Sequence, residues 1–107
     1  MTNVDRTAQN PNLLWWHGRL WLIDHGAALF FHHAAEPDVE HARNAFDVAA
    51  HVLLPYASSL DAARERLAPK ITDALLEEVT ATVPTEWLDA DDRRPYVDYL
   101  LIRNDVV

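Results

Sequence analysis

The sequence predicts an α+β domain that is mostly α-helical, with a small β-hairpin packed on a bundle of helices. Two runs of strand-forming side chains, at residues 13–16 and 20–23, enclose a turn that contains glycine. In the second half of the chain, apolar residues at helical spacing are separated by prolines and capping residues. A length of 107 residues suits a single domain, which we divide into segments 1–35 and 36–107.

Aromatic and branched aliphatic side chains predict the hairpin. Its strands read Leu-Leu-Trp-Trp and Leu-Trp-Leu-Ile, compositions that favour β-structure, and residues 17–19 form the His-Gly-Arg turn between them. A two-stranded hairpin is not stable alone in water. We therefore expect it to pack on the helices. We also expect Trp15, Trp16 and Trp21 to serve mainly in the core rather than as a stacking platform for a base.

A less regular region follows the hairpin. Residues 24–26, Asp-His-Gly, are predicted as a turn, and residues 27–31 as a short strand or a buried loop. Residues 34–45 contain few large apolar side chains. We expect a linker or surface loop there, with at most a helical turn.

Four helices are predicted in the second half of the chain. The first covers residues 45–54 and stops at the proline that follows. The second is capped by Ser58 or Ser59, with Asp61 at the capping-box spacing from Ser58, and it ends before Pro69. Its apolar face consists of Leu60, Ala63 and Leu67.

The third helix is capped by Thr72 and ends before Pro84, and residues 85–88 form a short turn. The last helix covers residues 92–103, with Pro95 in its first turn. The residues expected to face inward are Leu75, Leu76 and Val79 in the third helix and Val97, Leu100 and Leu101 in the last.

The chain is acidic. Its seventeen Asp and Glu outnumber nine Lys and Arg, and residues 36–107 supply the whole net charge of −8. Such a chain repels nucleic-acid backbones and anionic membranes, so we expect neither as a partner. The sequence has no cysteine, and its apolar runs are too short to span a bilayer. Because the first ten residues are polar and resemble no signal segment, we expect a cytoplasmic protein.

Oxygen-bearing side chains flank the predicted hairpin. A hairpin brings its outer ends together, so Asp24 is expected to lie close to residues 10–12. The Asp24 carboxylate and the amide oxygen of Asn10 or Asn12 are ligands of the kind that Mg²⁺ prefers. Asp5 adds a second carboxylate beside them. Phosphoryl transfer needs this metal and a carboxylate that can accept a hydroxyl proton.

This order of parts resembles the catalytic core of protein-kinase-like phosphotransferases. Residues 5–10, Asp-Arg-Thr-Ala-Gln-Asn, match the Asp-x4-Asn catalytic loop, and residues 24–26 resemble the Asp-Phe-Gly turn that follows a hairpin. The Asp-Arg pair is also similar to phosphatidylinositol-kinase-like enzymes. The Asn-x-Asp-x4-Asn stretch at residues 3–10 looks most like HipA-type kinases, and residues 10–29 are similar to a group of bacterial HipA-like proteins. The resemblance covers about a quarter of the chain closely.

The resemblance implies both a fold and an activity. Segment 36–107 would be a bundle like a kinase C-lobe, with Mg²⁺ and ATP as cofactors. The reaction would transfer the γ-phosphoryl group of ATP to a hydroxyl, most often on a protein substrate. Asp5 would be the catalytic base, Asn10 the secondary metal ligand, and Asp24 the ligand of the Mg²⁺ that bridges the phosphates. Asn12 stays open as the alternative to Asn10, because it precedes two leucines as the metal-binding Asn often does in protein kinases.

The chain departs from the kinase pattern in its nucleotide-covering parts. A kinase also needs a glycine-rich loop over the phosphates and a strand lysine. The two glycines, Gly18 and Gly26, lie in no such loop, and the single lysine, Lys70, falls between two helices. We therefore expect a C-terminal kinase part that is truncated, inactive, or completed by a partner with the nucleotide-binding lobe.

Two other functions remain as alternatives. The chain would be a non-catalytic, pseudokinase-like module for interaction or homo-oligomerisation, or a histidine-based metal-binding domain. The histidines near the predicted site are His17, His25, His32 and His33. Adjacent side chains on an extended segment point to opposite faces, so we expect one of His32 and His33 in the core and one at the surface.

Overall fold

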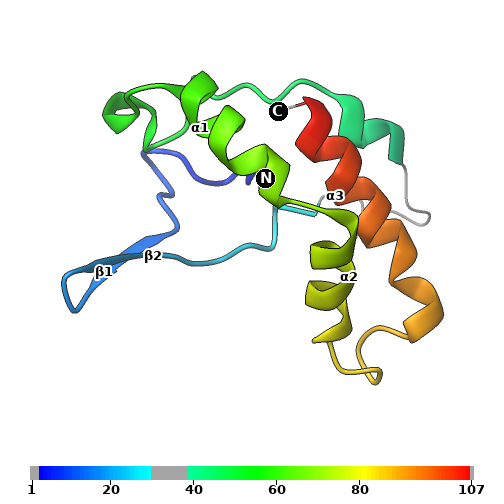
Figure 1. Cartoon of the computed structure of the whole chain (residues 1–107). Helices are drawn as coiled ribbons and strands as arrows, with labels where there is room; N and C mark the ends of the chain where they lie inside the picture. Colours follow the sequence, from blue (N-terminus) through cyan, green and yellow to red (C-terminus); the bar gives the residue numbers. More distant parts are fainter. Residues whose placement is uncertain (1–2, 30–38, 107) are drawn as a thin grey trace.

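The computed structural model describes residues 3–29 and 39–106 and confirms an α+β fold that is mostly α-helical. A two-stranded antiparallel hairpin precedes three α-helices and several short 3₁₀ helices (Figure 1). In chain order the elements are β1 (Leu13–Trp16), β2 (Arg19–Leu22), η2 (Val39–Arg43), η3 (Leu54–Tyr56), α1 (Leu60–Leu67), η4 (Ala68–Lys70), α2 (Asp73–Ala81), η5 (Ala90–Asp92) and α3 (Arg94–Val106).

The hairpin turn is one residue tighter than predicted. Trp16 pairs directly with Arg19, so only His17 and Gly18 connect the strands. Both turn residues have positive φ, 50° at His17 and 71° at Gly18, as a type I′ turn requires. This turn matches the twist of the strands, and it shifts β2 to Arg19–Leu22.

The prediction that the hairpin packs on the helices is wrong. Figure 1 shows β1 and β2 extending away from the helical part of the molecule. Trp15, Trp16 and Trp21, which were expected in the core, are all exposed. The hairpin is held at its base, where Ile23 N donates to Asn12 O at 3.0 Å, and neither of its faces is covered by a helix.

The core lies along α3. Val97 and Tyr99 of α3 are buried, Ala42 of η2 is fully buried against Tyr99, and Leu76 is the buried apolar residue of α2. The inward positions of Val97 and Leu76 are therefore confirmed. The other predicted inward residues are only half-buried or are exposed, since few elements cover this small core; they are Leu60, Ala63, Leu67, Leu75, Val79, Leu100 and Leu101.

Two arginines of α3 connect it to its neighbours. Arg103 is buried and donates from Nη1 to the carbonyl oxygens of Ala42, at 3.0 Å, and Asn44, which gives the end of η2 hydrogen-bond partners. Arg94 is exposed and forms ion pairs with Asp73 and Glu77 of α2 and with Asp98. Hydrogen bonds to Asp98 and Asp73 raise the pKa of Arg94 above its usual range.

The predicted helix at residues 45–54 is wrong. This segment forms turns and ends in the 3₁₀ helix η3. Its backbone bonds instead to the region before the hairpin, because Val52 N donates to Arg6 O at 3.0 Å and Thr7 forms an isolated bridge with His51. Asp47 Oδ1 also accepts from Ala49 N at 2.8 Å, a side-chain turn that competes with helix formation.

Most of the other predictions of helix ends and turns are confirmed. α1 and α2 end before Pro69 and Pro84, and Leu88 N donates to Pro84 O in the expected turn. The helical turn allowed at residues 34–45 is η2. α3 begins at Arg94, two residues later than predicted, because Asp92 belongs to η5, and it continues to Val106. Phe30, Phe31, His32, His33 and residues 34–38 lie outside the described residues.

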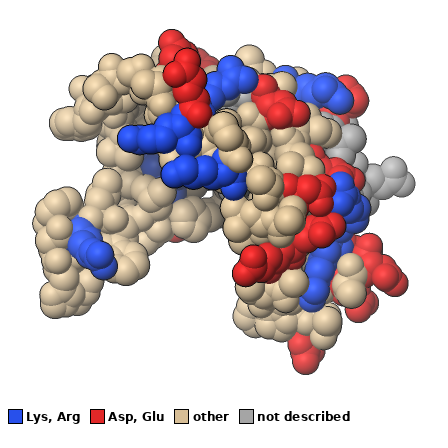
Figure 2. Space-filling model, viewed as in Figure 1, with Lys and Arg blue, Asp and Glu red and all other residues tan. Residues whose placement is uncertain are grey.

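Charge is distributed unevenly between the hairpin and the helices. Figure 2 shows acidic side chains gathered over the helical part, whereas the projecting hairpin shows one basic patch and mostly uncharged atoms. Among residues 3–29 and 39–106, each helix is too short or too polar to cross a lipid bilayer.

Ser59, rather than Ser58, caps α1, so Ser59→Ala should lower the free energy of unfolding by about 1 kcal/mol. The Ser59 hydroxyl accepts from Ala62 N at 3.1 Å, and alanine removes this acceptor. Urea denaturation followed by far-UV circular dichroism measures the loss. Ser58→Ala is the matched control and should leave the midpoint unchanged; equal losses in the two variants would contradict the assignment.

Candidate functional site

Two residues at the base of the hairpin have a left-handed backbone. Asn12 precedes β1 with φ of 46°, and Asp24 follows β2 after one residue with φ of 51°. Outside glycine this conformation is uncommon, and Asn and Asp tolerate it best. Because Ile23 N donates to Asn12 O at 3.0 Å, Asn12 lies opposite the residue that precedes Asp24. The hairpin therefore brings an amide and a carboxylate to the same end.

Asn3 joins the Asp5 segment to the Asp24 turn. Its side chain is buried, and its Nδ2 donates to Asp24 O at 2.9 Å. Its Oδ1 accepts from Asp5 N at 3.2 Å. A buried amide with both ends bonded holds its partners firmly, because breaking either bond leaves a buried polar group without a partner. The Asn3 side chain thus sets the position of the Asp5 backbone relative to that of Asp24.

Asn12 is connected to the same unit. Its Nδ2 donates to Asp5 O at 3.3 Å, so Asp5, Asn12 and Asp24 belong to one hydrogen-bonded group. Asn10 makes different contacts: its backbone N donates to Thr7 Oγ1 at 3.2 Å and its carbonyl accepts from Thr7 N at 3.0 Å. Of the two candidate amides, the structure brings Asn12 to Asp5 and to the hairpin base, and it places Asn10 in a separate turn.

Arg6 is a component of this group that the sequence analysis did not assign. It is only 7% exposed, and its Nη2 donates to Ile23 O at 3.2 Å and lies 3.5 Å from Nδ1 of His25. Arg6 therefore supports the residues on both sides of Asp24. The Asp-Arg pair in the sequence was the signal available for this role.

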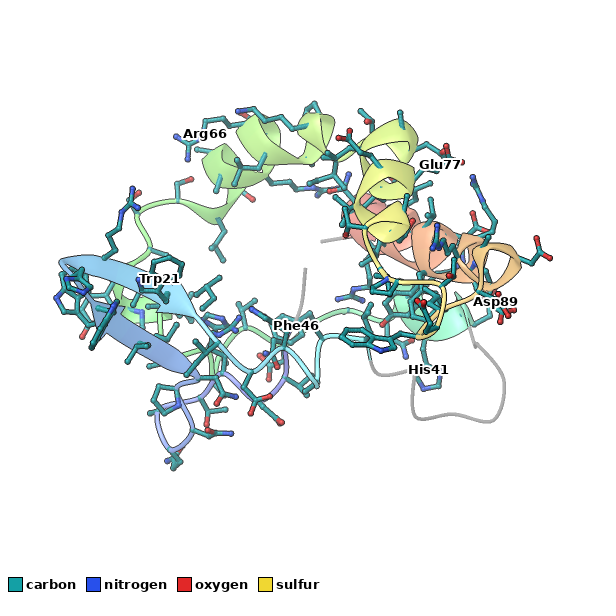
Figure 3. The ribbon with its side chains drawn as sticks, turned by 90° about the horizontal axis from the view of Figure 1, so that it is seen from below. Trp21, His41, Phe46, Arg66, Glu77 and Asp89 are labelled. Carbon is teal, nitrogen blue, oxygen red and sulfur yellow. The ribbon has the colours of Figure 1, made fainter. Side chains whose placement is uncertain are left out.

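A hollow of about 220 Å³ lies next to this loop without including its carboxylates. The lining comes from the segment before the hairpin and from the turns near Phe46. Figure 3 shows Phe46 between Trp21, at one end of the molecule, and Asp89, at the other. The lining residues are Asn3, Val4, Arg6, Thr7, Ala45, Phe46, Asp47, Ala50 and His51. Since Asp5 and Asp24 are absent from the lining, this hollow is separate from the predicted phosphoryl-transfer residues.

The described histidines form no metal centre. Within residues 3–29 and 39–106, no three side chains of His, Cys, Asp or Glu come together in a way that could hold a metal ion. His51 Nδ1 accepts from Leu53 N at 3.2 Å, and the ring of His17 lies edge-on to Trp16. His32 and His33, which were also considered, lie outside the described residues.

The donor atoms at the hairpin base suit Mg²⁺. This ion prefers oxygen ligands and is held by one or two protein groups together with phosphates. Asp24 and Asp5 are exposed, so their carboxylates can reach a ligand in solvent. Because Asn12 uses its Nδ2 to bond Asp5 O, its Oδ1 stays available as an oxygen ligand. The chemistry of these side chains therefore fits the implied cofactor.

Comparison of the chain with protein-family models, with curated proteins and with solved structures found no match.

Replacing Asn3 should destabilise the whole hydrogen-bonded group. In Asn3→Ala both Asp24 O and Asp5 N lose a partner, and we expect the free energy of unfolding to fall by roughly 1–3 kcal/mol. Thermal denaturation measures the loss. Asn10→Ala is the matched control, since no bond of the Asn10 side chain is seen, and it should be nearly neutral. Equal stability of Asn3→Ala and wild type would contradict the role given to Asn3.

Proposed function

We propose that this chain provides the catalytic-loop part of a HipA-like phosphotransferase, which transfers the γ-phosphoryl group of ATP to a hydroxyl on a protein. The observation that carries the proposal is that Asn12 Nδ2 donates directly to Asp5 O, while the buried amide of Asn3 joins Asp5 N to Asp24 O. Two of these three residues hold a left-handed backbone, and such conformations cluster at functional sites. The order of motifs along residues 3–26 supports the same reading.

Each residue has a role in this proposal. Asp5 would accept the proton of the attacking hydroxyl, and Asp24 and Asn12 would hold Mg²⁺ through oxygen atoms. When bound, Mg²⁺ neutralises charge on the nucleotide phosphates. Asn3 and Arg6 are positioning residues, because they hold the backbone of the Asp24 turn and touch no reacting atom.

The remaining nucleotide-binding groups come from elsewhere in this proposal. The 107 residues contain no glycine-rich loop and no lysine near the site, and both are needed to position phosphates. A nucleotide-binding lobe would supply them. The lack of cysteine is compatible with the reducing cytoplasm that we propose as the location.

Binding of Mg-ATP to the proposed site should stabilise the fold. A ligand at a hundred times its Kd stabilises by about 2.7 kcal/mol, which for a domain this small raises Tm by roughly 10 °C or more. We expect a rise for wild type and none for Asp24→Asn, since asparagine keeps the left-handed backbone but removes the charge that binds the metal. Differential scanning fluorimetry with and without Mg-ATP measures the shift.

The control for this test is Asp91→Asn, which removes an exposed carboxylate in η5, close in sequence to Asp89, which Figure 3 shows at the end of the molecule opposite Trp21. It should keep the full shift. If wild type shows no shift, or if the two variants lose it equally, this chain does not bind Mg-ATP at Asp24.

Two glycine variants should distinguish the candidate amides. Asn12→Gly preserves the left-handed backbone and removes the side-chain oxygen, so it should reduce the Tm shift caused by Mg-ATP. Asn10→Gly is the matched variant two positions earlier and should retain the shift. Each shift is measured relative to the same variant without ligand, which separates metal binding from the lost bond to Asp5 O. The opposite result would assign the ligand role to Asn10.

The exposed hairpin favours a second function, that of a non-catalytic interaction module. Trp15, Trp16 and Trp21 are exposed side by side on the hairpin of a chain with a net charge of −8. Exposed apolar patches of this kind mark contact sites with other proteins. In this alternative the Asp5 loop is a remnant of a kinase ancestor, and the hairpin contacts a nucleotide-binding lobe or another copy of the chain.

A further inference from the structure

We propose that the hollow lined by residues 3–7 and 45–51 binds a small monocarboxylate with an apolar body, and that Arg6 pairs with the carboxylate of this ligand. The inference goes beyond phosphoryl transfer, because neither Asp5 nor Asp24 lines the hollow.

Arg6 is a buried cation without a counter-ion. It is only 7% exposed, and no Asp or Glu among residues 3–29 and 39–106 forms an ion pair with it. Its Nη2 bonds a neutral carbonyl, that of Ile23. Its Nε is buried and has no hydrogen-bond partner in the described part of the chain. Charged side chains are almost never buried without a partner. Arg6 therefore has both a charge and a donor to offer to an anion.

The hollow distinguishes Arg6 from the other buried arginines. Arg93 and Arg103 also have a buried Nε without a partner among the described residues. Neither of them lines the hollow, whereas Arg6 does. The volume of about 220 Å³ is smaller than the roughly 300–1,000 Å³ of pockets for drug-sized ligands. The space beside Arg6 therefore suits a small molecule.

Two further lining residues can donate hydrogen bonds. Leu53 N donates to His51 Nδ1 at 3.2 Å, so the proton of the neutral ring is on Nε2, which can donate. Thr7 Oγ1 accepts from Asn10 N at 3.2 Å, and its hydroxyl hydrogen stays available. Asn3 also lines the hollow, but both ends of its amide are already bonded. The available polar groups near Arg6 are therefore donors, as an anion requires.

The rest of the lining selects among anions. Four of the nine lining residues are apolar and suit a hydrocarbon body; they are Val4, Ala45, Phe46 and Ala50. Asp47 is the one acid in the lining, and it is exposed. Its negative charge opposes a dianion such as phosphate more strongly than it opposes a monoanion. The combination favours a monocarboxylate that carries an apolar group.

The test is a titration of the whole chain, followed in two-dimensional amide NMR spectra, without nucleotide. The probes are isovalerate, its neutral analogue isovaleramide, and inorganic phosphate. We expect isovalerate to bind with a Kd on the order of 1 mM and to shift the amides of residues 3–7 and 45–51. Isovaleramide should bind at least tenfold more weakly, which corresponds to about 1.4 kcal/mol, because it cannot pair with Arg6 as an ion.

A filled hollow should abolish binding without changing any polar group. Ala50 is exposed and lines the hollow, so Ala50→Leu places a larger side chain in this space. We expect it to weaken isovalerate binding at least tenfold. Ala49→Leu is the matched control, because Ala49 is the exposed neighbour that does not line the hollow, and it should leave the Kd unchanged. Far-UV circular dichroism checks that both variants keep their helices.

A third variant tests the charge argument. Asp47 Oδ1 accepts from Ala49 N at 2.8 Å, and asparagine keeps an oxygen for this turn while it removes the charge. Asp47→Asn should therefore tighten isovalerate binding about twofold to threefold, since it removes a screened repulsion at the surface.

Four results would overturn the proposal. The first is the absence of amide shifts at isovalerate concentrations of about ten times the expected Kd. The second is equal binding of isovalerate and isovaleramide, and the third is tighter binding of phosphate than of isovalerate. The fourth is equal weakening by Ala50→Leu and Ala49→Leu. Each of these results is obtained without Mg-ATP and at residues other than Asp24, so this proposal and the proposed function fail separately.

Discussion

The buried amide of Asn3 is the interaction on which the arrangement of the candidate site depends. It bonds Asp24 O through Nδ2 and Asp5 N through Oδ1, and so connects the two ends of a segment that contains the hairpin. A buried amide that loses a partner becomes costly, and this penalty keeps the segment closed. Arg6 adds a parallel connection to Ile23 O, and Asn12 adds one to Asp5 O. Together these bonds convert a polar loop and a hairpin base into one unit.

The same loop is connected to the helical half through its backbone. Val52 N donates to Arg6 O, and Thr7 bridges His51. These bonds use backbone groups of residues 45–54, which were predicted to form a helix, and they place that segment beside the site. The helical half is organised around α3, where Tyr99 packs on Ala42 and Arg103 bonds the end of η2. The hairpin remains outside both sets of contacts, which explains why its apolar faces are open and why a partner is expected there.

Local signals predicted most of the secondary structure. The Thr72 cap and the prolines that follow α1 and α2 act within a few residues, so the helix boundaries that they set can be predicted from the sequence. Of the candidate site, Asp5 and Asp24 were found from motif spacing, which favoured Asn10 and kept Asn12 as the alternative amide. Arg6 and the linking role of Asn3 were missed, because their partners lie 17 and 21 residues away.

By itself, the sequence determined the hairpin, the helix caps and the kinds of oxygen donors that flank the turn at residues 24–26. These features depend on steric preferences and hydrogen bonds between neighbours in the chain. The tertiary structure decided three further points. It chose Asn12 over Asn10 as the amide joined to the hairpin base, replaced the helix at residues 45–54 with contacts to Arg6 and Thr7, and left the tryptophans exposed. Each of these outcomes depends on which distant backbone groups meet, because a buried polar group must find its partner in space rather than in sequence.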